Sequence, residues 1–111
     1  MKFLILPLTL AVMSFQASAA WKTGEITGYI PSSEGLKEII IFKLNENPIG
    51  GCNTTGRFAM DSNSPRYKAS VTAIISAFHS KTPVRVSYLS TCNSWGNSAD
   101  ASFICIGDIN C

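Results

Sequence analysis

The residues best suited to bind a ligand lie in one polar run, Asn93-Ser94-Trp95-Gly96-Asn97. No apolar neighbour in this run explains the tryptophan as part of a buried strand or helix. An indole ring can stack on the apolar C–H face of a sugar while flanking amides and hydroxyls bond the sugar's own hydroxyl groups. We therefore predict a ligand site at Trp95, Asn97, Asn93 and Ser94. The alternative is that Trp95 folds back as a lid on the core, because tryptophan is usually mostly buried.

Groups that could perform catalysis are few and scattered. His79 is the sole histidine, and a general base needs a positioned partner. No serine stands in a G-x-S-x-G elbow, and Asp61, Asp100 and Asp108 lie at the ends of predicted strands, where acidic residues commonly form turns. We therefore expect no catalytic residue, no metal and no cofactor. A small hydrolase is kept as the least favoured function.

Four cysteines, Cys52, Cys92, Cys105 and Cys111, occur in the chain. They form no C-x-x-C pair and have no nearby histidine partner, so the spacing does not indicate a zinc site. Two disulfides are the natural interpretation, and three pairings are possible. Because Cys52 and Cys92 both lie in polar loops while Cys105 and Cys111 bound a short C-terminal span, we predict Cys52–Cys92 and Cys105–Cys111.

The N-terminus has the layout of a secretory signal peptide. A lysine at position 2 is followed by the apolar run Phe3 to Val12 and by the small residues Ala17-Ser18-Ala19. The apolar run is too short to span a bilayer. We predict residues 1–19 as the signal peptide, with cleavage one residue later as the alternative, and residues 20–111 as one domain. A secreted or periplasmic location follows, which permits disulfides.

The segment from Ser64 to Pro83 carries the clearest helical pattern. Its large apolar residues recur at the spacing that places them on one helix face. They are Tyr67, Val71, Ile74, Ile75 and Phe78. Ser64 before Pro65 is a start signal, and Pro83 is a stop signal, because the residue before a proline is disfavoured in the α region. We expect a helix here that buries its apolar face.

Five segments have the composition of strands, three before the helix and two after it. They are residues 21–31, 36–44, 57–61, 83–89 and 101–106. Gly24 and Gly28 predict a bend or bulge in the first, and segment 36–44, apolar on both faces, should lie centrally. This order matches the five-stranded Greek-key barrel of the oligonucleotide/oligosaccharide-binding (OB) fold, whose helix plugs one open end. The alternative is an α+β sheet with the helix on one face.

Two stretches of the C-terminal half resemble a known family: Arg85-Val86-Ser87-Tyr88-Leu89-Ser90 and the following Cys92-Asn93-Ser94-Trp95-Gly96-Asn97. They are similar to the strand and the cysteine, tryptophan and asparagine that follow the long helix in cholera-toxin-type B subunits. The Ala-Trp start, the Pro-Val-Arg-Val after the helix and the late cysteine pair also resemble subtilase-cytotoxin and pertussis-like B subunits. The resemblance to B subunits of bacterial pentameric AB toxins implies that Trp95 stacks on a sugar and Asn97 bonds its hydroxyls. A distant secreted relative with another role is the alternative.

A stripe of small residues lies roughly opposite the apolar face of the predicted helix. It consists of Ala69, Ala73, Ser76, Ala77 and Ser80. Small residues let another backbone approach closely, and in the toxin B subunits the resembling helices line the channel of the ring. We therefore predict an oligomer interface here, with a pentamer and an A subunit as the partners that the resemblance implies. The alternative is an exposed face chosen for helix propensity.

Charge and composition narrow the function further. The chain has nine Lys and Arg against seven Asp and Glu, with no basic cluster of the kind that binds nucleic acid. We predict a secreted, non-enzymatic module that recognises a glycan or another cell-surface ligand. The alternative function is a monomeric secreted or periplasmic domain with a structural or protein-interaction role.

Overall fold

A computed structural model describes residues 19–111, which form six strands and one helix. In chain order these are β1 (Ala20–Gly24), β2 (Ile26–Glu34), β3 (Lys37–Leu44), β4 (Phe58–Asp61), α1 (Tyr67–Ser80), β5 (Val84–Tyr88) and β6 (Ala99–Ile106). The predicted mainly β domain with a single helix before the last two strands is confirmed. The predicted signal peptide, except for Ala19, lies outside the described residues.

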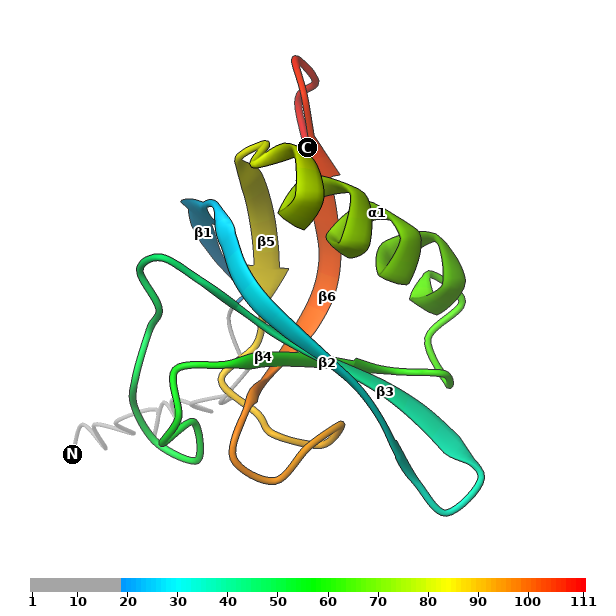
Figure 1. Ribbon diagram of the computed structural model, residues 1–111. Coiled ribbons are helices and arrows are strands. Elements are labelled where there is room, and N and C mark those ends of the chain that lie inside the picture. Colours follow the sequence, from blue (N-terminus) through cyan, green and yellow to red (C-terminus); the bar gives the residue numbers. More distant parts are fainter. Residues whose placement is uncertain (1–18) are drawn as a thin grey trace, which may run out of the picture.

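The six strands form one sheet in the order β1-β5-β6-β4-β3-β2. Neighbouring strands are antiparallel, except for the parallel pair β4–β6. Figure 1 shows β5 and β6 crossing β3 and β4 at a steep angle, so the sheet is strongly curved. The predicted five-stranded closed barrel is corrected: there are six strands, and across residues 19–111 no hydrogen-bonded ladder joins β1 to β2. β3 lies between two partners, as predicted for the segment that is apolar on both faces.

The strand count differs because the first predicted strand is interrupted at Glu25. The Oδ1 atom of Asn45 accepts a hydrogen bond from the Glu25 amide at 3.0 Å, and the Asn45 amide donates to the Glu25 carbonyl at 3.0 Å. A Cβ atom at Gly24 would clash with Asn45 Oδ1, so a larger residue there would displace this side chain. The pairing register then shifts between Ile26 and Gly28, which confirms the bulge that the glycines predicted.

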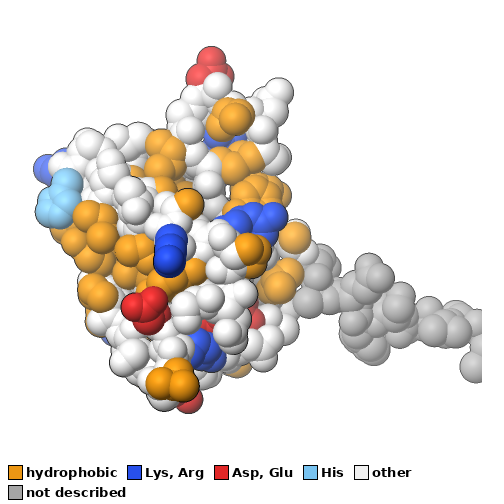
Figure 2. All heavy atoms as spheres, turned by 90° about the vertical axis from the view of Figure 1, so that its right-hand side faces the viewer, with side chains coloured by type: hydrophobic (Ala, Val, Ile, Leu, Met, Phe, Trp, Pro, Cys, Tyr) orange, Lys and Arg blue, Asp and Glu red, His pale blue; other side chains and the backbone are white. Residues whose placement is uncertain are grey.

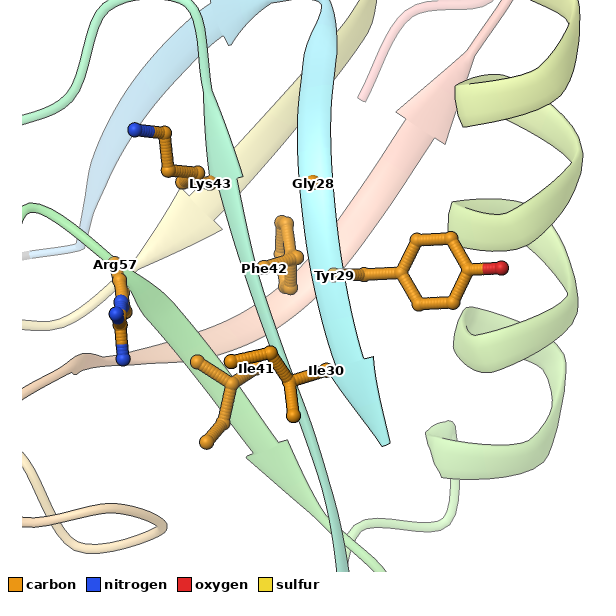
Figure 3. Close-up of a pocket in the computed structure, with 7 residues that line it drawn as sticks. All are labelled: Gly28, Tyr29, Ile30, Ile41, Phe42, Lys43 and Arg57. Atoms are coloured by element: carbon orange, nitrogen blue, oxygen red, sulfur yellow. The ribbon is translucent and has the colours of Figure 1, made fainter. Parts of the chain in front are cut away.

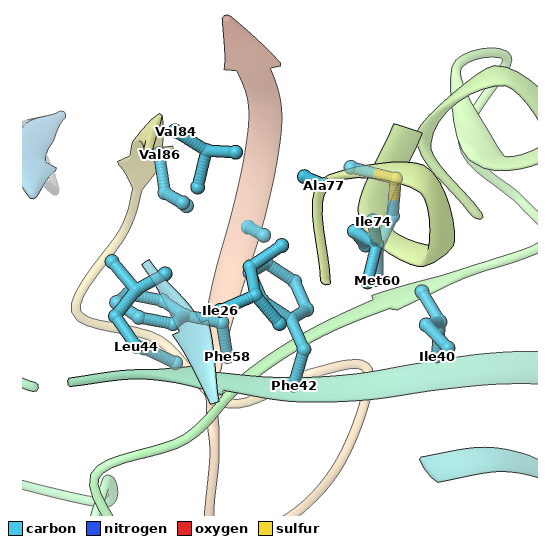
Figure 4. Close-up of a cluster of buried hydrophobic side chains, with 12 residues drawn as sticks. Ile26, Ile40, Phe42, Leu44, Phe58, Met60, Ile74, Ala77, Val84 and Val86 are labelled. Carbon is cyan, nitrogen blue, oxygen red and sulfur yellow. The ribbon is translucent and has the colours of Figure 1, made fainter. Parts of the chain in front are cut away.

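The core lies inside the curved sheet, under the helix (Figure 4). It consists of Ile26, Ile40, Phe42, Leu44, Phe58, Met60, Ile74, Ala77, Val84, Val86, Ala99 and Ala101. Alternate residues of each strand point inward, as the period of two requires. The rings of Phe42 and Phe58 stack with their centroids 5.4 Å apart, which joins β3 to β4 at the centre.

The helix is shorter than the predicted segment at both ends. Ser64 lies in the turn before α1, where its Oγ accepts a hydrogen bond from the Arg66 amide at 3.2 Å. At the other end, Lys81 adopts a left-handed conformation with φ of 56° and its amide donates to the Ala77 carbonyl. Such a left-handed residue ends a helix by itself, so α1 stops at Ser80, before Pro83.

The small-residue stripe on α1 is not one exposed face, which corrects part of the predicted oligomer interface. Ala77 is only 2% exposed and packs in the core. It lies three residues after the fully buried Ile74, which places it on the inward side of the helix. Ser76 and Ser80 are exposed, and Ala69 and Ala73 border a hollow beside β6. Figure 2 shows the side of the molecule that carries α1, where charged groups are scattered among hydrophobic side chains.

Both predicted disulfides are present. Cys52 and Cys92, with Cα atoms 6.1 Å apart, join the loop after β3 to the loop after β5. Cys105 and Cys111, with Cα atoms 6.6 Å apart, close the C-terminal tail. The first bond spans 40 residues of sequence and fixes the loop that carries Trp95.

Candidate functional site

The loop between β5 and β6 is folded around the carboxylate of Asp100. The Thr91 hydroxyl donates to Asp100 at 2.6 Å, and the backbone amides of Asn93 and Ser94 donate to it at 2.9 Å each. Partial burial raises the pKa of Asp100, but these hydrogen bonds outweigh it and hold that pKa below its usual value. The charged carboxylate therefore stabilises the loop at neutral pH.

Two of the four predicted ligand-binding residues, Ser94 and Asn93, take part in hydrogen bonds that hold the loop. Ser94 is 8% exposed, and its hydroxyl donates to the Asp61 carboxylate at 2.9 Å. Asp61 also pairs with Lys37, with the Lys37 Nζ atom 3.6 Å from Asp61 Oδ2. Ser94 thus ties the loop to β4. Asn93 is exposed and contributes its backbone amide to the Asp100 contact.

Trp95 is half-buried on the outer face of the sheet. It packs against a second hydrophobic cluster made of Ile39, Ile41 and Ala59. These residues alternate with the core residues of β3 and β4, so they point away from the core. The lid interpretation is therefore correct in part: Trp95 covers apolar residues, but those residues form a separate cluster.

One side of Trp95 and the predicted partner Asn97 line an open hollow of about 400 Å³. Ser33 and Glu34, at the end of β2, line it from the facing hairpin, together with Gly96. The Asn97 backbone is held from outside the loop, because the Thr55 hydroxyl donates to its carbonyl oxygen at 2.8 Å. The structure thus brings Trp95 and Asn97 together with a carboxylate and a hydroxyl that the sequence did not single out.

A second hollow of about 210 Å³ lies on the same outer face (Figure 3). Outward-pointing Ile30, Ile41, Lys43 and Arg57 line it beside Gly28, whereas Tyr29 points toward α1. Sequence reasoning missed this hollow. The available signal was the apolar outward-facing positions of β3 followed by a basic one, but only the pairing of Gly28 with Lys43 shows that space is left there.

His79 lies on α1 at a hollow of about 460 Å³ that also borders Glu25 and Thr27. The Thr27 hydroxyl donates to the Leu44 carbonyl at 3.4 Å rather than to His79. In the part of the chain that the structure describes, no hydrogen bond joins His79 to either neighbour, and no group of three His, Cys, Asp or Glu side chains is placed to hold a metal ion.

Comparisons with protein-family models, curated proteins and solved structures found no match for this chain. Among the described residues, no helix combines the length and the apolar character that crossing a membrane requires.

Proposed function

We propose that this chain is a secreted or periplasmic, non-enzymatic module that binds a glycan in the hollow between Trp95 and Glu34. The observation that carries the proposal is the composition of that hollow. It has a volume of about 400 Å³ and is lined by Trp95 and Asn97 from the loop and by Ser33 and Glu34 from β2. A flat aromatic side chain beside amide, hydroxyl and carboxylate groups suits a sugar, which has an apolar face and a rim of hydroxyls.

Rigid support of the loop favours this function. The disulfide at Cys92, the hydrogen bonds to Asp100 and the contact from Thr55 to Asn97 all hold the loop in place before a ligand arrives. A preorganised site loses less conformational entropy on binding than a mobile one. Trp95 is therefore presented with one side on the sheet and another toward the hollow.

The finer fold assignment is part of the proposal. β1 and β2 lie at the two ends of the sheet, yet only Glu25 separates them in the chain. Taken together as one long strand, they give the strand order and the parallel β4–β6 pair of an OB-type barrel. In that fold, ligands bind on the outer face of the central strands between two loops, which correspond here to the β2–β3 turn and the Trp95 loop.

A glycan array tests the function with matched variants. Trp95→Leu keeps an apolar cover on Ile39 and Ile41 but removes the flat ring, and Asn97→Ala removes the amide. We expect both to lose the array signal of the wild-type chain, while Trp21→Leu, on another part of the surface, retains it. A wild-type chain that binds no glycan, or a signal unaffected by Trp95→Leu, would contradict the proposal.

The alternative, a monomeric structural or protein-interaction domain, is favoured by the packing of Trp95 on the Ile39–Ile41–Ala59 cluster. A tryptophan that serves as a cover needs no ligand. This function predicts an empty array and loss of stability, rather than of binding, in Trp95→Leu.

The resemblance to toxin B subunits extends the proposal to a ring-shaped homo-oligomer with an A subunit. Ala69, Ser76 and Ser80 are the exposed part of the stripe that remains for such an interface. Native mass spectrometry of the chain tests the assembly: a pentameric mass supports it, and a monomeric mass at micromolar concentration contradicts it.

A further inference from the structure

We propose that the glycan is acidic, with a carboxylate or sulfate group bound by Lys43 and Arg57 and an uncharged sugar of the same chain stacked at Trp95. The inference rests on the proposed function and names the class of glycan. It is drawn from the second hollow, whose lining residues differ from those of the hollow at Glu34 and Asn97.

The two hollows belong to one continuous face. β2 and β3 pair in the register Gly28 with Lys43, Ile30 with Ile41, and Ser32 with Ile39. Trp95 packs against the Ile39–Ile41–Ala59 cluster, of which Ile41 also lines the second hollow, and Trp95 itself lines the first. Trp95 therefore lies between the hollows, and a ligand chain can pass from one to the other beside its ring.

The second hollow combines uncompensated positive charge with an apolar floor. Across residues 19–111, neither Lys43 nor Arg57 lies within ion-pairing distance of a carboxylate. Such basic groups favour an anion, and the planar guanidinium can donate two parallel hydrogen bonds to a carboxylate or sulfate.

Space for the anion comes from Gly28. A side chain at this position would meet nothing within 4 Å, so the surface opposite Lys43 is open. Ile30, which is 46% exposed, and the buried Ile41 form the floor. An apolar floor below two cations matches a sugar ring that carries a charged substituent.

Charge also sets the direction of the bound chain. Glu34 lies at the far hollow, and the five steps along β2 from Gly28 to Ser33 span about 17 Å at roughly 3.3 Å per residue. An anionic group is repelled by Glu34 and attracted by Lys43 and Arg57. The acidic unit therefore occupies the Lys43 end and an uncharged unit with hydroxyl donors occupies the Glu34 end.

Calorimetric titration of the wild-type chain with three oligosaccharides tests the inference. The probes are a κ-carrageenan hexasaccharide, which carries sulfate groups and no carboxylate, a hyaluronan hexasaccharide, which carries carboxylates and no sulfate, and neutral maltohexaose; in both acidic probes charged and uncharged sugars alternate. We expect tighter binding of at least one acidic probe than of maltohexaose, and weaker binding of that probe as salt is raised. The two acidic probes distinguish sulfate from carboxylate recognition.

Paired charge variants separate a site from general attraction. Lys43→Gln/Arg57→Gln should lower the affinity for the acidic probe at least about tenfold, since each hydrogen bond to a charged group contributes substantially to binding. Lys68→Gln/Lys81→Gln removes the same charge from exposed positions on and after α1 and should change binding less than about twofold, because a screened distant charge acts weakly. Equal losses in both variants would overturn the inference.

Two further outcomes separate this inference from the proposed function. Maltohexaose binding that requires Trp95 and equals or exceeds acidic-probe binding overturns the acidic preference but supports the glycan function. Acidic binding that requires Lys43 and Arg57 but is unchanged in Trp95→Leu supports the anion site and overturns stacking at Trp95. Absence of binding to both acidic probes overturns the inference.

Discussion

The two tryptophans of this chain both lie on the outside of the curved sheet, but their surroundings differ. Trp21, on β1, meets Phe103, on β6, edge to face with ring centroids 5.2 Å apart. Between them in the sheet lies Ser87, only 2% exposed, whose small side chain lets the rings meet above it. Trp95 comes instead from a loop and lies between two hollows.

The basic residues beside the two tryptophans differ in the same way. The Arg66 guanidinium stacks over the Phe103 ring at 5.5 Å from its centroid, so this cation already has a partner within the chain. Lys43 and Arg57 have no carboxylate partner among residues 19–111. Around Trp21 the aromatic and basic groups contact one another, with Arg66 at the start of α1 over Phe103 of β6, whereas the groups beside Trp95 are left available to a ligand.

The largest expected effect comes from removing the brace of the Trp95 region. Cys52→Ser/Cys92→Ser should lower the free energy of unfolding by about 4 kcal/mol, because the bond closes a long loop in the unfolded chain. Urea unfolding followed by circular dichroism measures it. Cys105→Ser/Cys111→Ser, which opens a short span, should cost only about 2 kcal/mol. Equal losses would show that the two disulfides do not differ as the loop-length argument requires.

The next effect is expected at Asp100. Asp100→Asn removes the charge that accepts from Thr91, Asn93 and Ser94, and should lower the free energy of unfolding at pH 7 by about 2 kcal/mol, since hydrogen bonds to charged groups contribute more than neutral ones. Asp100→Asn should leave the surroundings of Trp21 in the folded chain unchanged. The emission of Trp21 in the folded chain, recorded in a Trp95→Phe background, is therefore the control for an intact fold.

Acid should act on the same group. The pKa of Asp100 is lower in the folded chain than its ordinary value, so its contribution to stability is complete above the unfolded-state pKa of about 4 and is lost as pH falls through the folded-state pKa. Wild type should therefore lose more stability than Asp100→Asn between about pH 5 and pH 2. Parallel urea titrations at these pH values test this, and identical slopes would contradict the assignment.

A smaller effect is expected for the aromatic pair on the other side. A double-mutant cycle with Trp21→Ala and Phe103→Ala should give a coupling energy of about 1 kcal/mol, because edge-to-face rings attract one another beyond the area they bury. A coupling near zero would show that the rings are neighbours without a specific interaction, which would weaken the contrast with Trp95.

The smallest effect is spectroscopic. Trp21 is 44% exposed, whereas Trp95 is half-buried against Ile39 and Ile41. Acrylamide should quench the emission of Trp95→Phe, which retains Trp21, more strongly than that of Trp21→Phe, which retains Trp95. The ratio of Stern–Volmer slopes measures the difference. A neutral quencher is required, because an ionic one would be biased by Lys43 and Arg57.

Much of the fold could be predicted because its signals are local. The spacing of Tyr67, Ile74 and Phe78 predicts the helix from its period alone, and the polar surroundings of Cys52 and Cys92 favour the observed pairing. The alternation of large apolar residues likewise predicts the strands. The C-terminal end of the helix was less predictable, because the residue in the left-handed conformation there is Lys81 rather than the glycine that usually marks such a position.

The candidate site was predictable only in part. Trp95 and Asn97 could be singled out because a tryptophan in a polar run has no local explanation. The inward position of Ala77, the bond from Ser94 to Asp61 and the space above Gly28 could not, because each depends on which distant segment lies opposite.

The amino-acid sequence by itself determined the elements of this protein, their order and the disulfide-braced loop that carries Trp95, because period, composition and cysteine context act over a few neighbouring residues. Only the tertiary structure decided that Asn45 splits the first strand and that Lys43 and Arg57 share an open face with Trp95. The physical reason is that strand register is set by long-range pairing, and a register shift of one residue moves every side chain to the opposite face.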